Sequence, residues 1–206
     1  MEYTKPDEIE KRSFEIIGSE LPRPLDPTFA PVIMRVIHTT ADFEYVESLA
    51  FSGGVIEHAI AALRRGAQIV SDTNMVKAGV DKTRLHALGG EVFCFMRDED
   101  VAEAARRGGA TRARAAIDKA AAIGKPMIFA IGNAPTALMR ICELFKAGQC
   151  SPILVIGVPV GFVHVVESKE MLMQSGIPYI TARGRKGGSN VAAAICNALL
   201  RMAEAE

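Results

Sequence analysis

The chain has 206 residues, of which 49% are hydrophobic, and 24 basic residues balance 24 acidic ones, so its formal net charge is zero. This length suits a single domain over residues 1–206, and the neutral balance argues against a nucleic-acid binder or an anionic-membrane binder. The polar N-terminus predicts no signal peptide, and no run of 18 apolar residues could span a membrane. We therefore expect a cytoplasmic protein.

Several familiar site motifs are absent from the sequence. The four cysteines are scattered, without a Cys-x-x-Cys pair, so we expect small buried residues in a reducing compartment. There is no Gly-x-Ser-x-Gly elbow, no Gly-x-Gly-x-x-Gly after the first strand and no His/Cys/carboxylate set at metal spacing. The residues thus predict no metal site.

The first 50 residues predict helices and no strong strand. Residues 7–21 carry apolar side chains at helical spacing and end before Pro22 and Pro24. Asp26 then precedes a second helix with an apolar face formed by Val32, Ile33, Val36 and Ile37.

From residue 53 onward, short apolar runs alternate with helical stretches. The runs predict five strands, at 68–71, 91–95, 127–131, 153–157 and 178–181. The main helical stretches cover 98–107, 111–123, 135–147 and 188–203. Alternation of this kind predicts an α/β fold, a three-layer α/β/α sandwich around a mainly parallel sheet. Five strands suit a flavodoxin-like order, although the sequence does not determine the order.

Ligands of open parallel sheets bind beyond the carboxyl ends of the strands. The segments at those ends are rich in glycine, proline, small polar residues or bases, and they cover 71–75, 96–97, 132–136, 157–162 and 183–190. We expect the site to be built from these segments.

Three of these regions leave alternatives open. Residues 132–136 predict either an anion site at a helix start or an ordinary turn capped by Asn133. Residues 157–162 are apolar and stiff, which fits the wall of a large ring or a rigid turn. Residues 183–190 place three cations before a helix near Ser189, which fits an anionic ligand or a solvated loop. Arg112, in the first turn of a helix opened by Thr111, opposes the helix dipole and is a further candidate.

His38 is the candidate proton donor. It lies among polar groups near a helix end, three residues after Arg35 and hence on the same helical face. Imidazole both gives and takes a proton near neutral pH. His58, His86 and His164 have plainer surroundings.

Taken together in this order, seven segments resemble the precorrin-8 methylmutase family of cobalamin biosynthesis. The matching segments are 12–14, 35–42, 71–75, 132–138, 157–162, 167–170 and 184–190. Residues 38–42 are more similar to the cobalt-precorrin-8 branch, the anaerobic route, than to the cobalt-free branch.

The resemblance implies an isomerase that moves a methyl group from C-11 to C-12 of the corrinoid ring and yields cobyrinate or hydrogenobyrinate. It places the family's histidine at His38, as the acid that protonates a ring nitrogen. It also implies no cofactor, cobalt being part of the substrate, and a homodimer with sites near the subunit interface.

The expected substrate is a tetrapyrrole with an apolar body and carboxylate arms. Apolar loops suit its body, while cations and helix-start amides suit its arms. The substrate-binding candidates are Ser13, Arg35, Thr39, Ser71, Asp72, Thr73, Arg112, Asn133, Ala134, Pro135, Thr136, Val158, Pro159, Val160, Gly161, Arg183, Arg185, Lys186, Gly187, Gly188 and Ser189.

Two other functions compete with the isomerase. A corrinoid carrier without catalysis would use the same pocket, and a flavodoxin-like nucleotide or flavin binder would hold phosphate in the basic loop. Replacing His38 by alanine would abolish turnover in an enzyme but change nothing in a carrier. A flavin absorbance band would identify a flavin-binding protein.

Overall fold

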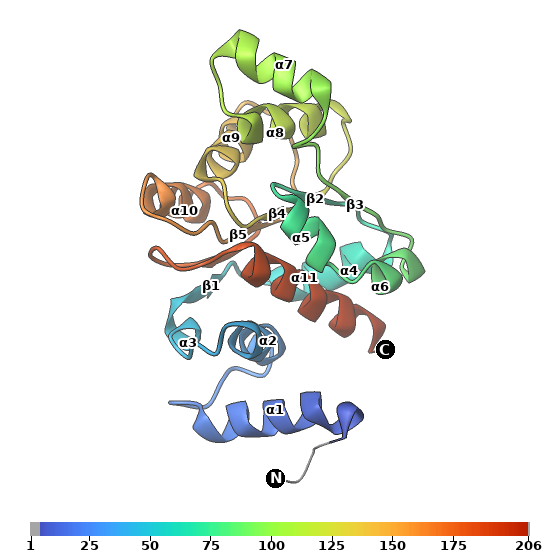
Figure 1. The fold of residues 1–206 in the computed structure, drawn as a ribbon, viewed down its shortest axis with the longest axis vertical. Coiled ribbons are helices and arrows are strands. Elements are labelled where there is room, and N and C mark those ends of the chain that lie inside the picture. The colour runs from blue at the N-terminus through green and yellow to red at the C-terminus, as the bar shows by residue number, and fades with distance from the viewer. Residues whose placement is uncertain (1–4, 206) are drawn as a thin grey trace.

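A six-stranded sheet forms the centre of the structure, a computed structural model that describes residues 5–205 (Figure 1). The strand order is β1-β6-β5-β4-β2-β3. Strands β2 to β6 are parallel, and β1 pairs with β6 in the antiparallel direction. The strands are β1 (Leu49–Phe51), β2 (Ile69–Ser71), β3 (Val92–Phe93), β4 (Ile128–Ile131), β5 (Leu154–Gly157) and β6 (Tyr179–Ala182).

The five parallel strands follow the flavodoxin-like order, because β3-β2-β4-β5-β6 is the pattern 2-1-3-4-5. This confirms the predicted α/β architecture, but the prediction of five strands was wrong by one. Strand β1 lies in the region expected to hold only helices. Its strand conformation depends on pairing with β6, which lies far later in the chain, and no local pattern reveals that pairing.

Helices cover both faces of the sheet (Figure 1). On one side α11 lies between the sheet and α2, and α1 packs on the outer side of α2. This side contains α1 (Pro6–Glu20), α2 (Ala30–Thr40), α3 (Tyr45–Ser48), α4 (Val55–Arg64), α5 (Asn74–Gly79), α6 (Lys82–Ala87) and α11 (Ser189–Glu204). The other side contains α7 (Glu99–Gly108), α8 (Arg112–Ala122), α9 (Pro135–Lys146) and α10 (Val165–Gln174).

The strands supply side chains to two separate cores, one on each face of the sheet. In β4, Ile128 and Ala130 join the core beneath α11, whereas Phe129 and Ile131 join the core beneath α9. All four residues are buried, as expected for a parallel strand covered on both faces. None of the helices in the described part of the chain combines the length and the hydropathy needed to span a bilayer.

Candidate functional site

The segments that follow β2, β4 and β6 meet at the carboxyl edge of the sheet. The Thr73 hydroxyl lies 2.9 Å from the Ser189 hydroxyl, and it also accepts a hydrogen bond from Val76 N that caps α5. Gly132 lies so close to the start of α11 that an added Cβ would stand 2.7 Å from Ser189 Cα. Three of the five segments expected to build the site are therefore in contact at this edge.

Asp72 ties the segment after β2 to the segment after β4. Its side chain is buried, with Oδ1 accepting a hydrogen bond from Gly132 N at 2.9 Å and Oδ2 accepting from Asn133 N at 2.8 Å and Ala134 N at 2.7 Å. Burial raises the pKa of Asp72, while the three amides favour its ionised form. The anion expected at these amides thus belongs to the protein itself, and the cap of α9 is Ala134 rather than Asn133.

Ser71 also uses its side chain for hydrogen bonds within the protein. Its hydroxyl is buried and lies 3.1 Å from the carbonyl oxygens of both Thr73 and Phe93. Ser71 and Asp72, both candidates for substrate contact, therefore hold the loops in place from beneath.

The apolar segment after β5 divides into a buried part and an exposed part. Val158 and Pro159 are buried, and Val158 belongs to the core under α11. Val160, Phe162 and Val163 are exposed, with 82% of Phe162 accessible. The exposed apolar surface of this segment thus lies at 160–163 rather than at its start.

The segment after β6 carries three cations in two different situations. Arg183 and Arg185 are exposed, and the Arg185 guanidinium lies 5.4 Å from the centroid of the Phe162 ring. Lys186 instead pairs with Asp42 at 2.6 Å and Glu44 at 2.5 Å. These carboxylates raise the pKa of Lys186, and Lys186 lowers the pKa of Asp42. Two of the three predicted cations are thus available to an anionic ligand.

Two glycines allow the segments after β5 and β6 to lie against each other. A Cβ on Gly187 would stand 2.2 Å from the Val158 carbonyl oxygen, a distance that no side chain tolerates. Gly188 has φ of 132°, in the region that favours glycine, and its N–H donates to the same Val158 oxygen. Both residues therefore shape the loop through their main chain.

Lys169 of α10 is buried beneath the basic segment. Only 1% of it is accessible, and its ammonium group donates to the carbonyl oxygens of Gly184 at 2.9 Å and Lys186 at 2.7 Å. Burial lowers the pKa of Lys169 to about 8. Both acceptors are neutral main-chain groups of the segment after β6.

His38 is exposed near the C-terminal end of α2. Its ring stacks on Phe14 of α1, with centroids 5.2 Å apart, and the Arg35 guanidinium lies 4.6 Å from the same Phe14 ring. The predicted common face of Arg35 and His38 is therefore confirmed. One turn later, Asp42 binds Lys186, so the end of α2 adjoins the segment after β6.

Ser13 and Arg35 make their bonds within the helical layer. The Ser13 hydroxyl donates to Ile9 O, and Arg35 pairs with Glu10 at 2.8 Å beside a hollow of about 340 Å³ between α1, α2 and α11. Arg35 also lowers the pKa of Glu10 through this bond. Thr39, by contrast, is exposed next to His38.

Arg112 lies at the rim of the same sheet edge. It is exposed in the first turn of α8, where Thr111 caps the helix by accepting from Arg114 N. The Thr111 hydroxyl lies 2.8 Å from the Thr136 hydroxyl of α9, which places the starts of the two helices side by side.

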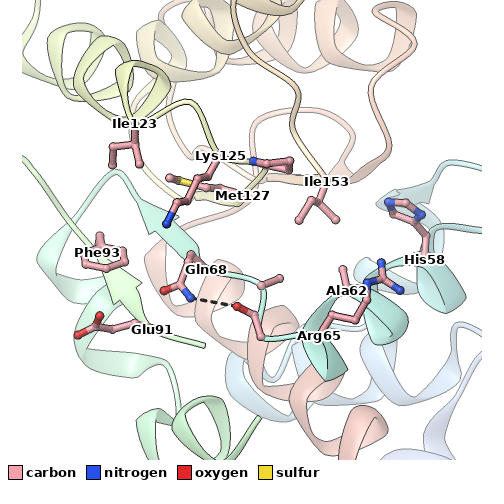
Figure 2. A pocket seen from close by; sticks show the side chains of 13 residues that line it. His58, Ala62, Arg65, Gln68, Glu91, Phe93, Ile123, Lys125, Met127 and Ile153 are labelled. Carbon is pink, nitrogen blue, oxygen red and sulfur yellow. Dashed lines mark hydrogen bonds between the residues drawn. The ribbon is translucent and has the colours of Figure 1, made fainter. Parts of the chain in front are cut away.

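A different hollow, of about 720 Å³, lies at the opposite edge of the sheet (Figure 2). Gln68, Glu91, Met127 and Ile153 line it where they precede four parallel strands. Its cations, such as Arg65 at the C-cap of α4, stand where a helix dipole favours positive charge. Because ligands of such sheets bind at the carboxyl edge, this hollow is separate from the candidate site.

Comparison with known proteins agrees with this geometry. Residues 8–202 match the family model described as precorrin-8X methylmutase. The chain belongs to the precorrin-8X methylmutase family. It is thus an isomerase of cobalamin biosynthesis.

Relatives of this methylmutase align over nearly its whole length. It is 46% identical to a cobalt-precorrin-8 methylmutase of Priestia megaterium over 97% of this chain and 89% of the relative. It is also 46% identical to one of Salmonella typhimurium over 95% of each chain. The solved precorrin-8X methylmutase of Thermus thermophilus superposes with a TM-score of 0.88 and 40% identity, over 96% of this chain and 98% of that one.

Two residues beside the candidate site, Lys169 and Phe14, lie in segments that resemble the family but were not among the expected site residues. Lys169 follows Val165 by four residues and precedes Leu172 by three, so helical periodicity alone places it on the buried face of α10. Phe14 was noted within a matching segment, but its stacking on His38 depends on how two helices pack, which no local pattern reveals.

Proposed function

We propose that this methylmutase converts cobalt-precorrin-8 into cobyrinate by moving a methyl group from C-11 to C-12 of the macrocycle, with His38 as the acid. The observation that carries the proposal is the ion pair between Lys186 and Asp42, because it joins the basic segment to the helix end at which His38 is exposed. A base for carboxylate arms and a proton donor for the ring thus lie in adjoining elements.

The proposed chemistry conserves every atom. A protonated imidazole of His38 donates its proton to a ring nitrogen, which makes the macrocycle electron-poor. The bond between C-11 and the methyl group breaks as the bond to C-12 forms, and the double bonds of the ring shift with it. The proton is then returned, so that substrate and product are isomers.

The surroundings of His38 support this role. Stacking on Phe14 fixes the plane of the imidazole, which is exposed and therefore accessible to a large substrate. The exposed side chains of Val160, Phe162 and Val163 offer an apolar surface for the body of the ring. The cations of Arg112, Arg183 and Arg185 would bind the carboxylate arms of the substrate. The proposed reaction uses no cofactor.

We also propose that the protein acts as a cytoplasmic homodimer with its sites near the subunit interface. An exposed Phe162 and Val163 are unusual for a free surface and would be covered by the substrate or by the second subunit. The four cysteines are free thiols, which fits a reducing compartment.

The visible spectrum of the protein with cobalt-precorrin-8 tests the proposal, because formation of a corrin changes the conjugation and hence the colour. The wild-type protein should convert the substrate, and His38→Ala should bind it with unchanged affinity but not convert it. His58→Ala, which removes an exposed imidazole at the opposite edge of the sheet, is the matched control and should convert normally. Full conversion by His38→Ala would refute the catalytic role.

A further inference from the structure

Lys169 stands out among the buried side chains because it is an ammonium group whose two hydrogen bonds go to the basic segment. Burying an ammonium group costs free energy unless other groups replace its water. Here the carbonyl oxygens of Gly184 and Lys186 do so. The interaction that offsets the cost of burial is therefore one that also fixes the main chain of this segment.

The three successive carbonyl groups of the segment have alternating partners. Those of Gly184 and Lys186 accept from Lys169, whereas the carbonyl of Arg185 accepts from Gly161 N at 3.2 Å. Lys169 thus holds one side of the main chain and the segment after β5 holds the other. The segment is held through its backbone, which leaves the side chains of Arg183 and Arg185 exposed.

The same contacts lead to the helix that carries His38. Lys169 fixes the carbonyl of Lys186, and the side chain of Lys186 binds Asp42 just beyond the end of α2. Lys169 and Asp42 are thus linked through a single residue, Lys186, whose carbonyl oxygen bonds to Lys169 and whose ammonium group bonds to Asp42. A shift of the segment would therefore move the cations and also loosen the contact with α2.

We propose that Lys169 is a positioning residue, which holds the segment 183–188 so that its cations and the end of α2 face the same substrate. This inference rests on the proposed function. Lys169 is buried and its ammonium group bonds to the carbonyl oxygens of Gly184 and Lys186, so it would act on substrate binding through these two residues.

The test compares Lys169→Met, Lys169→Gln and the control Lys146→Met, which removes an exposed lysine from α9. Losing a hydrogen bond to a charged group changes an equilibrium by about tenfold or more, so Lys169→Met should raise KM for cobalt-precorrin-8 about tenfold. Its kcat should change much less than its KM, because the ring of His38 is still held by its stacking on Phe14. Lys169→Gln retains an uncharged NH₂ group with two N–H donors, so its KM should fall between those of the wild type and Lys169→Met, and Lys146→Met should match the wild type.

Amide hydrogen exchange provides an independent readout on the same proteins. In Lys169→Met and Lys169→Gln, the amides of Gly161 and Gly188 should exchange faster, because each bonds across the segment interface. Amides of α9 should be unaffected. A merely structural lysine would instead alter exchange throughout the protein.

Unchanged KM and unchanged exchange in either folded variant would overturn the inference, as would a lower kcat with KM and exchange unaltered. If Lys169→Met fails to fold, Lys169→Gln decides by the same measurements. If the wild-type protein does not convert cobalt-precorrin-8, the proposed function fails, while the exchange of Gly161 and Gly188 still decides whether Lys169 positions the segment.

Discussion

Replacing Asp72 by asparagine tests how the carboxyl edge of the sheet is held together. Asparagine has the size of aspartate but only one acceptor oxygen. If that oxygen keeps the bonds from Asn133 N and Ala134 N, the new NH₂ group faces Gly132 N–H, donor against donor. One bond to a charged group is lost, at about 1.5–3 kcal/mol, and the two remaining bonds become neutral and weaker.

Removing a buried charge offsets part of this loss, so we expect Asp72→Asn to lower the free energy of unfolding by about 3 kcal/mol. Urea denaturation measures this quantity, and the slope of the transition should not change. Asp26→Asn is the matched control, because Asp26 is exposed and its side chain accepts one hydrogen bond, from Thr28 N. The free energy of unfolding should fall by less than about 0.5 kcal/mol in this variant. If Asp72→Asn is as stable as Asp26→Asn, the hydrogen bonds from the three main-chain amides to Asp72 do not stabilise the fold as described.

Three other predictions concern the segment after β6 and the cations around it. Gly187→Ala should raise KM several-fold and destabilise the fold by about 2 kcal/mol, because its methyl group would meet a main-chain oxygen at 2.2 Å, while Gly53→Ala meets nothing and should match the wild type. The pKa of Lys169 is about 8 in the folded protein, below its ordinary value of 10.5. As pH rises from 8 toward 10.5, the folded protein therefore releases a proton from Lys169 that the unfolded chain still binds. The unfolding free energy of the wild type relative to Lys169→Met should therefore rise over this range, by at most about 1.4 kcal/mol per pH unit, and a constant difference in urea denaturation would contradict this. Arg112→Ala and Arg183→Ala should weaken corrinoid binding in low salt and much less at about 0.5 M salt, without lowering kcat, and a large rate loss with unchanged affinity would be the opposite result.

The architecture of the sheet was largely predictable, because short runs rich in apolar residues, such as 127–131, alternate with helical stretches. Strand β1 was not, since three residues at the sheet edge gain their strand conformation from pairing with β6. The general rule that ligands bind beyond the carboxyl ends of parallel strands was enough to locate the candidate site.

Which polar groups meet each other was not predictable, because each such pair joins residues far apart in the chain. Asp72 and the amides of 132–134 are separated by about 60 residues, and Lys186 and Asp42 by 144. Both pairs changed the expected roles. Asp72 became an internal anchor, and Lys186 became a link to α2 rather than a free cation. The face on which Lys169 lies was available from helical spacing, but its acceptors were not.

The pH dependence of a single turnover tests the central claim most directly, namely that an imidazole at the end of α2 supplies the proton for methyl migration. The wild-type protein is mixed with limiting cobalt-precorrin-8 across about pH 5 to 9, and formation of the corrin is followed by its visible spectrum. We predict a rate that falls as pH rises, because the acid loses its proton, and no conversion by His38→Ala at any of these pH values. A rate that stays constant across the range would contradict the account.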